Sequence, residues 1–414
     1  IAVDLGDNAK ENKDATVTLI LNNADITCEV APAVIFYNVY ECADTDNPTK
    51  DVDTTKAGAN VVIADGSKNT INGSYVERIY DPQSVKLNSD KTEVEDADKL
   101  HKYDGAFYSK MSMNINSEKA NTGVLNINAE NEGLDSELHL TINGGNININ
   151  SGNDGINTNE DNVSVTTINN GTVTINVTGK TGEGDGIDSN GWLVINGGKV
   201  IASACSDSAD AGIDSDMGIH INGGTVIASG HMLDRIEDGG QTYAVFNFAQ
   251  QQKAGSQLCL KDEKDNAVFD ISPENKFSIL IYSSPQLTEG TYTLYSDNKQ
   301  LSGHSGDMFG IHNAQKPEGM EPPEGMERPE GMEPPEGMER PEGMERPEGM
   351  ERPEGMEPPE GMERPEGMEP PEGMERPEGM EPPEDFAKPD ATETEASTKF
   401  IINKGANTFS GIAQ

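Results

Sequence analysis

The middle of the chain alternates apolar and polar residues over short stretches. Leu138, Leu140 and Ile142 alternate with polar neighbours, and Ile147 and Ile149 do the same after a Gly-Gly pair. A period of two predicts β-strands with one buried face, whereas helical spacing is absent. Gly-Gly or Asn-Gly pairs separate the stretches, where the chain must turn through conformations that a Cβ resists. We therefore expect an all-β fold of short strands and tight corners.

Two sequence elements recur at a spacing of about 26 residues. An I-N-G-G pattern begins at Ile142, Ile168, Ile195 and Ile221, and an Ile-Asn pair at Ile115 lies 27 residues before the first of these. A D-G-I-D-S pattern occupies residues 185–189, with variants at 132–136, 154–158 and 211–215 and a further resemblance at 104–109. A unit of this length cannot close its own core, but stacked copies can. The repeats predict a parallel β-helix from about residue 16 to residue 229. Leucine-rich repeats are disfavoured because the L-x-x-L-x-L frame is absent.

The polar positions of these strands are rich in asparagine. Asn146, Asn148 and Asn150 project on the opposite face from the isoleucines between them. In coils stacked at about 4.8 Å they can form hydrogen-bonded ladders, or they serve only as turn formers. Residues 17–26 and 61–73 repeat the design of strand, corner and strand, and the charged insert at 75–102 is predicted to be a loop.

The periodicity stops after His231, and five apolar stretches between residues 244 and 294 predict antiparallel strands that cap the solenoid. Residues 317–382 then repeat PEGMEP or PEGMER eleven times, and proline at such short intervals prevents helix or sheet. Strand patterning resumes within residues 399–412. We expect a parallel β-helix carbohydrate-binding domain over 1–240, a C-terminal β cap over 241–316, a disordered insertion over 317–396 and terminal cap strands over 397–414.

The chain is strongly acidic, with 73 Asp and Glu against 30 Lys and Arg and a net charge of -43. The hexapeptides carry -16 of this charge, from 22 Glu and 6 Arg. Such a surface repels nucleic acid and anionic membranes unless cations intervene. We therefore expect no nucleic-acid partner and look to divalent cations as mediators.

Other features bear on the protein's location. No run of 18 apolar residues occurs, so no transmembrane helix is predicted. The first residues, IAVDLGDN, lack an initiator Met, as a processed chain would, and we expect a secreted or cell-surface protein. The four cysteines lack C-x-x-C spacing, and Cys28 and Cys42 could form a disulfide or remain free thiols.

The D-G-I-D-S element places a carboxylate or amide twice in each coil. If the coils stack in register, carboxylates about 5 Å apart repel one another, which raises pKa values or recruits cations. Ca²⁺ suits such a site because it takes six to eight oxygen ligands in irregular geometry. The alternative is that these residues are turn formers or solvated. The two predicted columns are Asp135, Asn157, Asp188 and Asp214, and Glu132, Asp154, Asp185 and Asp210, with Asp216 as a further candidate ligand.

Aromatic residues are scarce, and Trp192 is the sole tryptophan. Trp192 follows a D-S-N-G corner and could offer an exposed platform for a sugar ring, with Tyr108 as a second candidate. Packing at a corner is the alternative role for both residues.

These motifs together resemble a family of secreted clostridial and related bacterial carbohydrate-binding proteins. The resemblance rests on the D-G-I-D-S and I-N-G-G coils at 185–198 and 212–224, on the segments VTLILNNADIT and NVVIADGSKNTI, and on SSPQLTEGTYTLYS at 283–296. It implies a right-handed parallel β-helix, binding of cellulose and pectic polysaccharide, and calcium held by the acidic residues of the D-G-I-D-S turns. Ala211 departs from the acidic position, which Asp210 could fill.

We therefore predict non-catalytic binding of an acidic plant cell-wall polysaccharide such as polygalacturonate, or of cellulose, with calcium stabilising the coils or bridging the glycan. A polysaccharide lyase or glycoside hydrolase is an alternative, since β-helices also host pectate lyases and polygalacturonases. A lyase needs an Arg or Lys base, for which Arg78, Arg235, Lys180 and Lys199 are the candidates, and a hydrolase needs paired carboxylates. A surface adhesin or structural protein without a sugar ligand is a third possibility.

Overall fold

The computed structural model describes residues 1–76, 85–88, 91–92, 94–96, 103–306 and 396–414. Within these ranges every regular element is a β-strand except the 3₁₀ helix η1 (Ala9–Glu11), so the all-β expectation is confirmed. The hexapeptide repeat lies outside the described residues. The insert predicted as a loop at 75–102 contains the antiparallel pair β7 (Lys86–Leu87) and β8 (Val94–Asp96).

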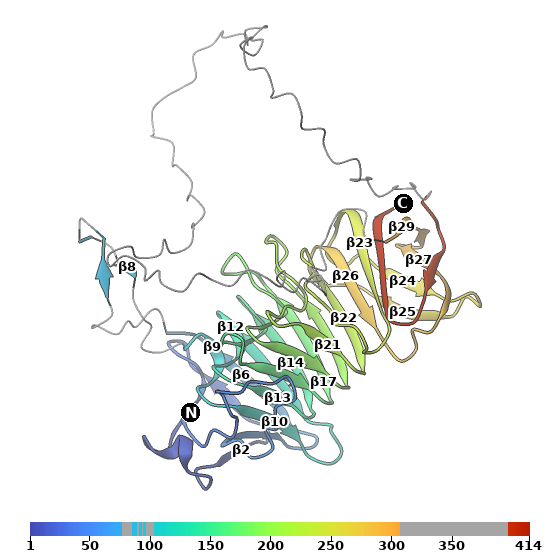
Figure 1. The fold of residues 1–414 in the computed structure, drawn as a ribbon. Helices are drawn as coiled ribbons and strands as arrows, with labels where there is room; N and C mark the ends of the chain where they lie inside the picture. Colours follow the sequence, from blue (N-terminus) through green and yellow to red (C-terminus); the bar gives the residue numbers. More distant parts are fainter. Residues whose placement is uncertain (77–84, 89–90, 93, 97–102, 307–395) are drawn as a thin grey trace, which may run out of the picture. The chain divides into compact units, whose positions relative to one another are not determined.

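Three sheets run through the repeats, and we call them sheets A, B and C (Figure 1). Sheet A contains β1 (Ala2–Asp4), β4 (Val34–Asn38), β9 (Gly105–Ser109), β12 (Glu132–Ser136), β15 (Ile156–Thr158) and β18 (Ile187–Ser189). Sheet B contains β2 (Val17–Leu21), β5 (Ala59–Ile63), β10 (Met113–Ser117), β13 (Leu140–Ile142), β16 (Val165–Ile168), β19 (Trp192–Ile195) and β21 (Ile219–Ile221). The repeat strands of sheet C are β3 (Asp25–Thr27), β6 (Lys68–Gly73), β11 (Val124–Ala129), β14 (Asn146–Ser151), β17 (Thr172–Val177), β20 (Lys199–Ser203) and β22 (Thr225–Gly230).

The chain visits these sheets in rotation, and we call one passage through A, B and C a coil. β12, β13 and β14 form one coil, and β15, β16 and β17 form the next. Each strand pairs in parallel with the equivalent strand of the neighbouring coil, so that Ile142 lies opposite Ile168 and Ile168 opposite Ile195. The predicted period therefore corresponds to parallel strand pairing between successive coils.

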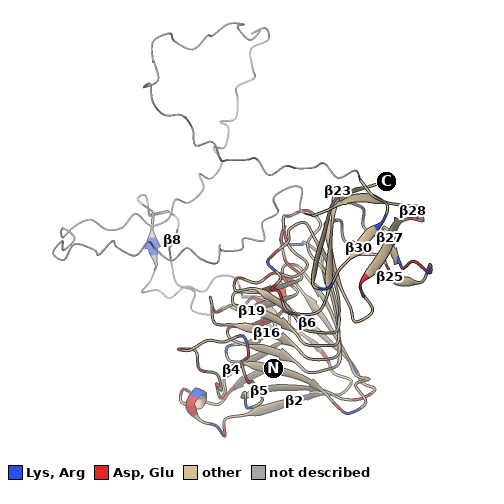
Figure 2. Cartoon of the chain, turned by 45° about the vertical axis from the view of Figure 1, so that its right-hand side comes forward, with Lys and Arg blue, Asp and Glu red and all other residues tan. Residues whose placement is uncertain are grey.

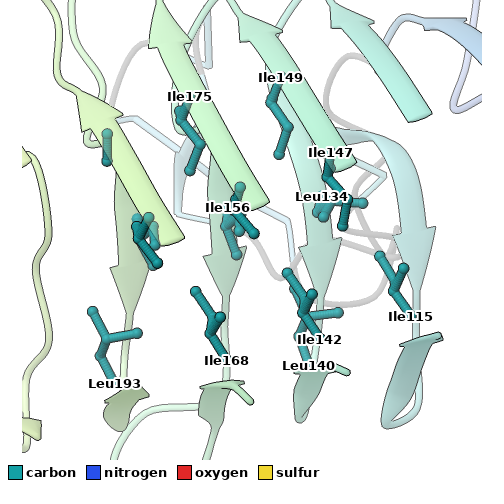
Figure 3. Packing of buried hydrophobic residues seen from close by; sticks show 14 of the residues in the cluster. Ile115, Leu134, Leu140, Ile142, Ile147, Ile149, Ile156, Ile168, Ile175 and Leu193 are labelled. Carbon is teal, nitrogen blue, oxygen red and sulfur yellow. The ribbon is translucent and has the colours of Figure 1, made fainter. Parts of the chain in front are cut away.

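The isoleucines of both repeated patterns form the core between the sheets. Ile156 and Ile187 of the D-G-I-D-S pattern and Ile142 and Ile168 of the I-N-G-G pattern are all fully buried. Figure 3 shows such side chains from successive coils packed in rows between the strands. At the corner that follows, Gly145 adopts a φ of 100°, a conformation in which a side chain would be strained. The pattern thus combines a buried strand end with a glycine-dependent turn.

The amides on the outer face of sheet C are bonded across coils. Asn148 Nδ2 donates to Asn126 Oδ1 at 3.0 Å, and Asn150 Nδ2 donates to Asn128 Oδ1 at 3.3 Å. Of the two alternatives for these asparagines, the structure therefore shows the ladder.

Sheet C continues beyond the last coil into the cap. β22 pairs antiparallel with β26 (Phe277–Ser283), followed by β23 (Tyr243–Gln252), β31 (Ala406–Ala413) and β29 (Ser302–Ser305). The second cap sheet contains β25 (Ala267–Ile271), β24 (Leu258–Lys261), β27 (Gly290–Ser296) and β28 (Lys299–Gln300), and β30 (Phe400–Ile402) pairs with β27. Phe246, Phe400 and Phe409 pack between these sheets. The strands expected after the hexapeptides are present, but β31 pairs with β23 in parallel where antiparallel pairing was expected.

The four cysteines are free thiols, so Cys28 and Cys42 are not joined in this structure. In the described ranges no helix has the length and hydrophobicity needed to cross a bilayer.

Candidate acidic site on sheet A

Each position of the D-G-I-D-S pattern has its own structural task, as residues 185–189 show. Ile187 is buried in the core, which turns the neighbouring Asp188 to the outer face of sheet A. Ser189 Oγ donates to the carbonyl oxygen of Trp192 at 3.0 Å and so stabilises the corner between sheets A and B. Gly186 N donates to the carbonyl oxygen of Ala211 at 3.0 Å, which joins this coil to the next.

The second carboxylate position of the pattern forms a column along sheet A. The strand register places Asp135 opposite Asn157 and Asn157 opposite Asp188. Asp135 is fully buried, and its carboxylate accepts hydrogen bonds from Asn159 Nδ2 at 2.6 Å and from the Gly105 amide at 3.2 Å. Burial, and then repulsion by neighbouring carboxylates, raises the pKa of Asp135 well above its usual value.

The first carboxylate position connects neighbouring coils. Asp154 Oδ1 accepts a hydrogen bond from the backbone N–H of Asp185 at 2.7 Å, and Asp185 Oδ1 accepts one from Ala211 at 2.5 Å. Asp210 Oδ2 accepts one from Gly184 at 2.6 Å. Burial and repulsion by Asp154 raise the pKa of Asp185 to about 9. These residues therefore act as links between coils.

Four carboxylates gather where the columns end, and we call Asp188, Asp214, Asp216 and Asp234 the acidic cluster. Burial comes first and mutual repulsion second in raising the pKa of Asp188 to about 6 and that of Asp214 to about 7. The pKa of Asp216 is raised for the same reasons. Figure 2 shows Asp and Glu in red mainly along the connecting segments, with the strands largely tan. The cluster thus concentrates negative charge at a site that is partly shielded from solvent.

Sequence reasoning missed Asp234, because it lies after the last recognisable coil. The chain there still continues the parallel stacking of the coils, since Ile219 and Ile236 form a parallel bridge. Asp234 Oδ2 accepts a hydrogen bond from the Ser215 amide at 3.1 Å, which holds it beside Asp214. Its only signal in the sequence is an acidic residue close behind the last D-G-I-D-S copy.

The donor atoms along these columns suit a hard cation. Asn157 Oδ1 is buried and accepts no hydrogen bond within the described part of the chain, while Asn157 Nδ2 donates to Glu132 Oε1 at 3.2 Å. A buried amide oxygen without a donor, beside carboxylates, fits an oxygen-binding ion such as Ca²⁺. No group of three or more His, Cys, Asp or Glu side chains among the described residues is already arranged to hold a metal ion.

The two aromatic candidates differ in accessibility. Trp192 is half-buried at the start of β19, so part of its ring remains exposed. Tyr108 is only 2% exposed, packs edge-on against Tyr103 with ring centroids 4.8 Å apart, and donates to Glu137 Oε1 at 3.0 Å. Burial leaves the Tyr108 ring no free face for a sugar, so the structure does not support this candidate.

Two of the four basic residues considered for a lyase form ion pairs. Arg235 forms an ion pair with Glu237 at 2.7 Å, and Lys180 forms one with Glu130 at 3.3 Å. Lys199 is exposed on sheet C, away from the D-G-I-D-S strands of sheet A. Arg78 lies outside the described residues.

Fold and site together define an all-β protein of stacked parallel strands with carboxylates lined up along one sheet. Residues 8–232 match the model of a family described as carbohydrate-binding domain-containing proteins, and because this is more than half of the chain, the protein belongs to that family. No sequence of a curated protein matches the chain. Among solved structures it is similar to the polysaccharide lyase-like protein from C. thermocellum, gadolinium derivative, with 18% identity over 54% of this chain and 71% of that chain. The TM-score of 0.35 does not establish a common fold.

Proposed function

We propose that this protein is a secreted, non-catalytic binder of acidic polysaccharide of the polygalacturonate type, which it holds through calcium at the acidic cluster. The observation that carries the proposal is the cluster itself. Asp188 and Asp214 are partly buried beside further carboxylates, and burial, followed by mutual repulsion, raises their pKa values to about 6 and about 7. A bound divalent cation would relieve this repulsion, and family membership supports a carbohydrate ligand.

The scaffold we propose is a right-handed parallel β-helix. The rotation of the chain through sheets A, B and C with parallel pairing supports the helix. The right hand is supported by the general rule that about 98% of crossovers between parallel strands of one sheet are right-handed. In this scaffold Asp154 and Asp185 hold the coils together through backbone N–H groups, while Asp188, Asp214 and Asp216 supply oxygen ligands.

Calcium explains how an acidic protein binds an acidic glycan. Because the ion accepts six to eight oxygen ligands, protein carboxylates leave positions open for the carboxylates and hydroxyls of a uronic-acid chain. Trp192, which begins the strand after Asp188 and is partly exposed, would contact a sugar ring in this arrangement.

Retention on immobilised polygalacturonate tests this function. We expect the wild type to bind in calcium and to be released by a chelator. The double variant Asp188→Asn/Asp214→Asn is expected to lose at least about ten-fold in affinity, equivalent to about 1.4 kcal/mol, because it removes two anionic ligands. Asp25→Asn/Glu29→Gln removes the same charge at exposed positions of the first coil and should bind like the wild type.

Retention that survives the chelator would contradict the calcium bridge. Release of unsaturated or reducing sugar ends in the same samples would show that the protein is an enzyme.

A further inference from the structure

A groove of about 300 Å³ lies between the outer face of sheet C and a segment of the cap, residues 270–274. Its floor comes from successive coils and includes Thr174 and Asn176 of β17 and Ile201 and Ser203 of β20. Its size is at the small end of ligand pockets, which span about 300–1,000 Å³. The groove lies on a different sheet from the acidic cluster.

The cap wall of the groove is anchored to the coils. Asn275 Nδ2 donates to the carbonyl oxygens of Val177 at 2.7 Å and Ala204 at 2.8 Å. Next to it, Lys276 Nζ forms an ion pair with Asp207 at 2.7 Å. Residues 270–274 are therefore fixed against the solenoid just before these anchors, which makes the groove a preformed one.

The amide ladder of sheet C has a direction, and it ends in this groove. Asn128 Nδ2 donates to Asn72 Oδ1 at 2.8 Å, Asn150 donates to Asn128 at 3.3 Å, and Asn176 donates to Asn150 at 3.5 Å. Each amide oxygen is thus satisfied by the following coil. The next coil has Ser203 at this position, and it accepts from Ser229 Oγ at 3.1 Å. Asn176 Oδ1 is consequently buried without a donor among the described residues.

We infer that this groove binds one or two residues of a neutral glycan chain, whose hydroxyl group donates to Asn176 Oδ1. The inference rests on the proposed function in so far as the ligand is a glycan, and it adds a second, calcium-independent subsite.

The lining favours an uncharged sugar. The floor combines hydroxyl and amide groups of Thr174, Asn176 and Ser203 with the apolar surface of Ile201 and Ile271, the mixture that the hydroxyl-bearing edge and the C–H face of a pyranose ring require. The groove is lined by two acidic side chains, Asp270 and Glu274, against one basic side chain, Lys199, so its net charge disfavours a uronic acid. A neutral hexose unit carries no charge for these carboxylates to repel, and its hydroxyl group supplies the donor that Asn176 Oδ1 lacks.

Affinity electrophoresis in gels containing hydroxyethylcellulose or glucomannan, with a chelator present, tests the subsite. The wild type is expected to be retarded by one of these glycans. Asn176→Leu removes the acceptor at similar volume, and Thr174→Trp fills the groove; each should weaken binding at least about ten-fold. Asn169→Leu is the matched control, because Asn169 also belongs to an amide ladder, with bonds of 2.9 Å on both sides, but lies on an exposed corner.

Thermal unfolding of each variant shows whether it is folded, and calcium-dependent retention on polygalacturonate shows whether the acidic site is intact. Unchanged retardation of both groove variants, or equal loss in Asn169→Leu, overturns the subsite and leaves the proposed function standing. A wild type that ignores the neutral glycans but binds polygalacturonate overturns the subsite alone. A wild type that binds no glycan overturns both.

Discussion

In a chelating buffer we expect the Tm of the protein to be about 5 °C or more higher at pH 6 than at pH 8.5. A change of 1 kcal/mol in the free energy of unfolding shifts the Tm of a domain of this size by about 2–4 °C. The cause is the set of buried carboxylates, of which Asp185 has a pKa of about 9 and Asp214 one of about 7. The usual value is 3.8.

The direction of this change in stability with pH follows from proton binding. A carboxylate with a raised folded pKa holds its proton more tightly in the folded protein than in the unfolded chain, so stability falls as the pH rises from about 4 through the folded pKa. The decrease contributed by Asp188 ends near pH 6, and that of Asp185 continues to about pH 9. His139 acts in the opposite sense between about pH 4 and its usual pKa of 6.5, because burial lowers its pKa to about 4, and from pH 6 to 6.5 it offsets a small part of the decrease.

Calcium should cancel much of this loss. An ion that binds only the folded protein stabilises it by about 2.7 kcal/mol at a concentration one hundred times its Kd. We expect millimolar calcium to raise the Tm at pH 8.5 and to flatten its pH dependence. Asp188→Asn/Asp214→Asn should already melt higher in chelator at pH 8.5 and should respond weakly to calcium. A Tm that does not depend on pH in chelator would show that the pKa values of these carboxylates are not raised in the folded protein.

Gly155→Ala is expected to cost about 3 kcal/mol or more in the free energy of unfolding, at the upper end of the range for overpacked sites. A Cβ on Gly155 would lie 2.6 Å from the carbonyl oxygen of Gly186 and even closer to the Ile175 side chain. The coil cannot move away, because Gly155 N donates to the Asp185 carbonyl at 3.0 Å. The glycine of the D-G-I-D-S pattern is therefore required by the close stacking of coils.

Urea unfolding followed by circular dichroism measures this cost. Gly255→Ala is the control, since Gly255 has a φ of 75° but no atom within 4 Å of the added Cβ, so that only the backbone penalty of about 1–2 kcal/mol applies. Equal losses in the two variants would mean that the stacked coils can separate to accept a methyl group.

Much of the fold could be predicted because its information is local and repeated. The alternation around Ile147 and Ile149 places strands and their buried face, and the Gly-Gly corners place the turns. Equal spacing of the I-N-G-G copies predicts which residues pair, and Ile142 does lie opposite Ile168. The same regularity predicts that Asp135, Asn157 and Asp188 share a column.

The candidate site could be predicted only in part. That Asp154 and Asp185 bind calcium stays a prediction, and the sequence did not predict that their Oδ1 atoms accept backbone N–H groups of the neighbouring coil. Tyr108 was assigned as a sugar platform, yet it is buried. For the two aspartates the contact comes from the next coil, 26 or more residues away in the sequence, and Tyr108 donates to Glu137, 29 residues away.

By itself, therefore, the sequence of this protein determined the repeating strand, corner and acidic positions, because these depend on neighbours along one strand and on a constant period. Only the tertiary structure decided that Asp234 joins the acidic cluster, that β31 pairs in parallel with β23 across the hexapeptide insertion, and that Asn176 ends its ladder in a groove. These outcomes depend on where the repeat stops and on which segments pack against its last coils. Neither can be read from the local sequence pattern.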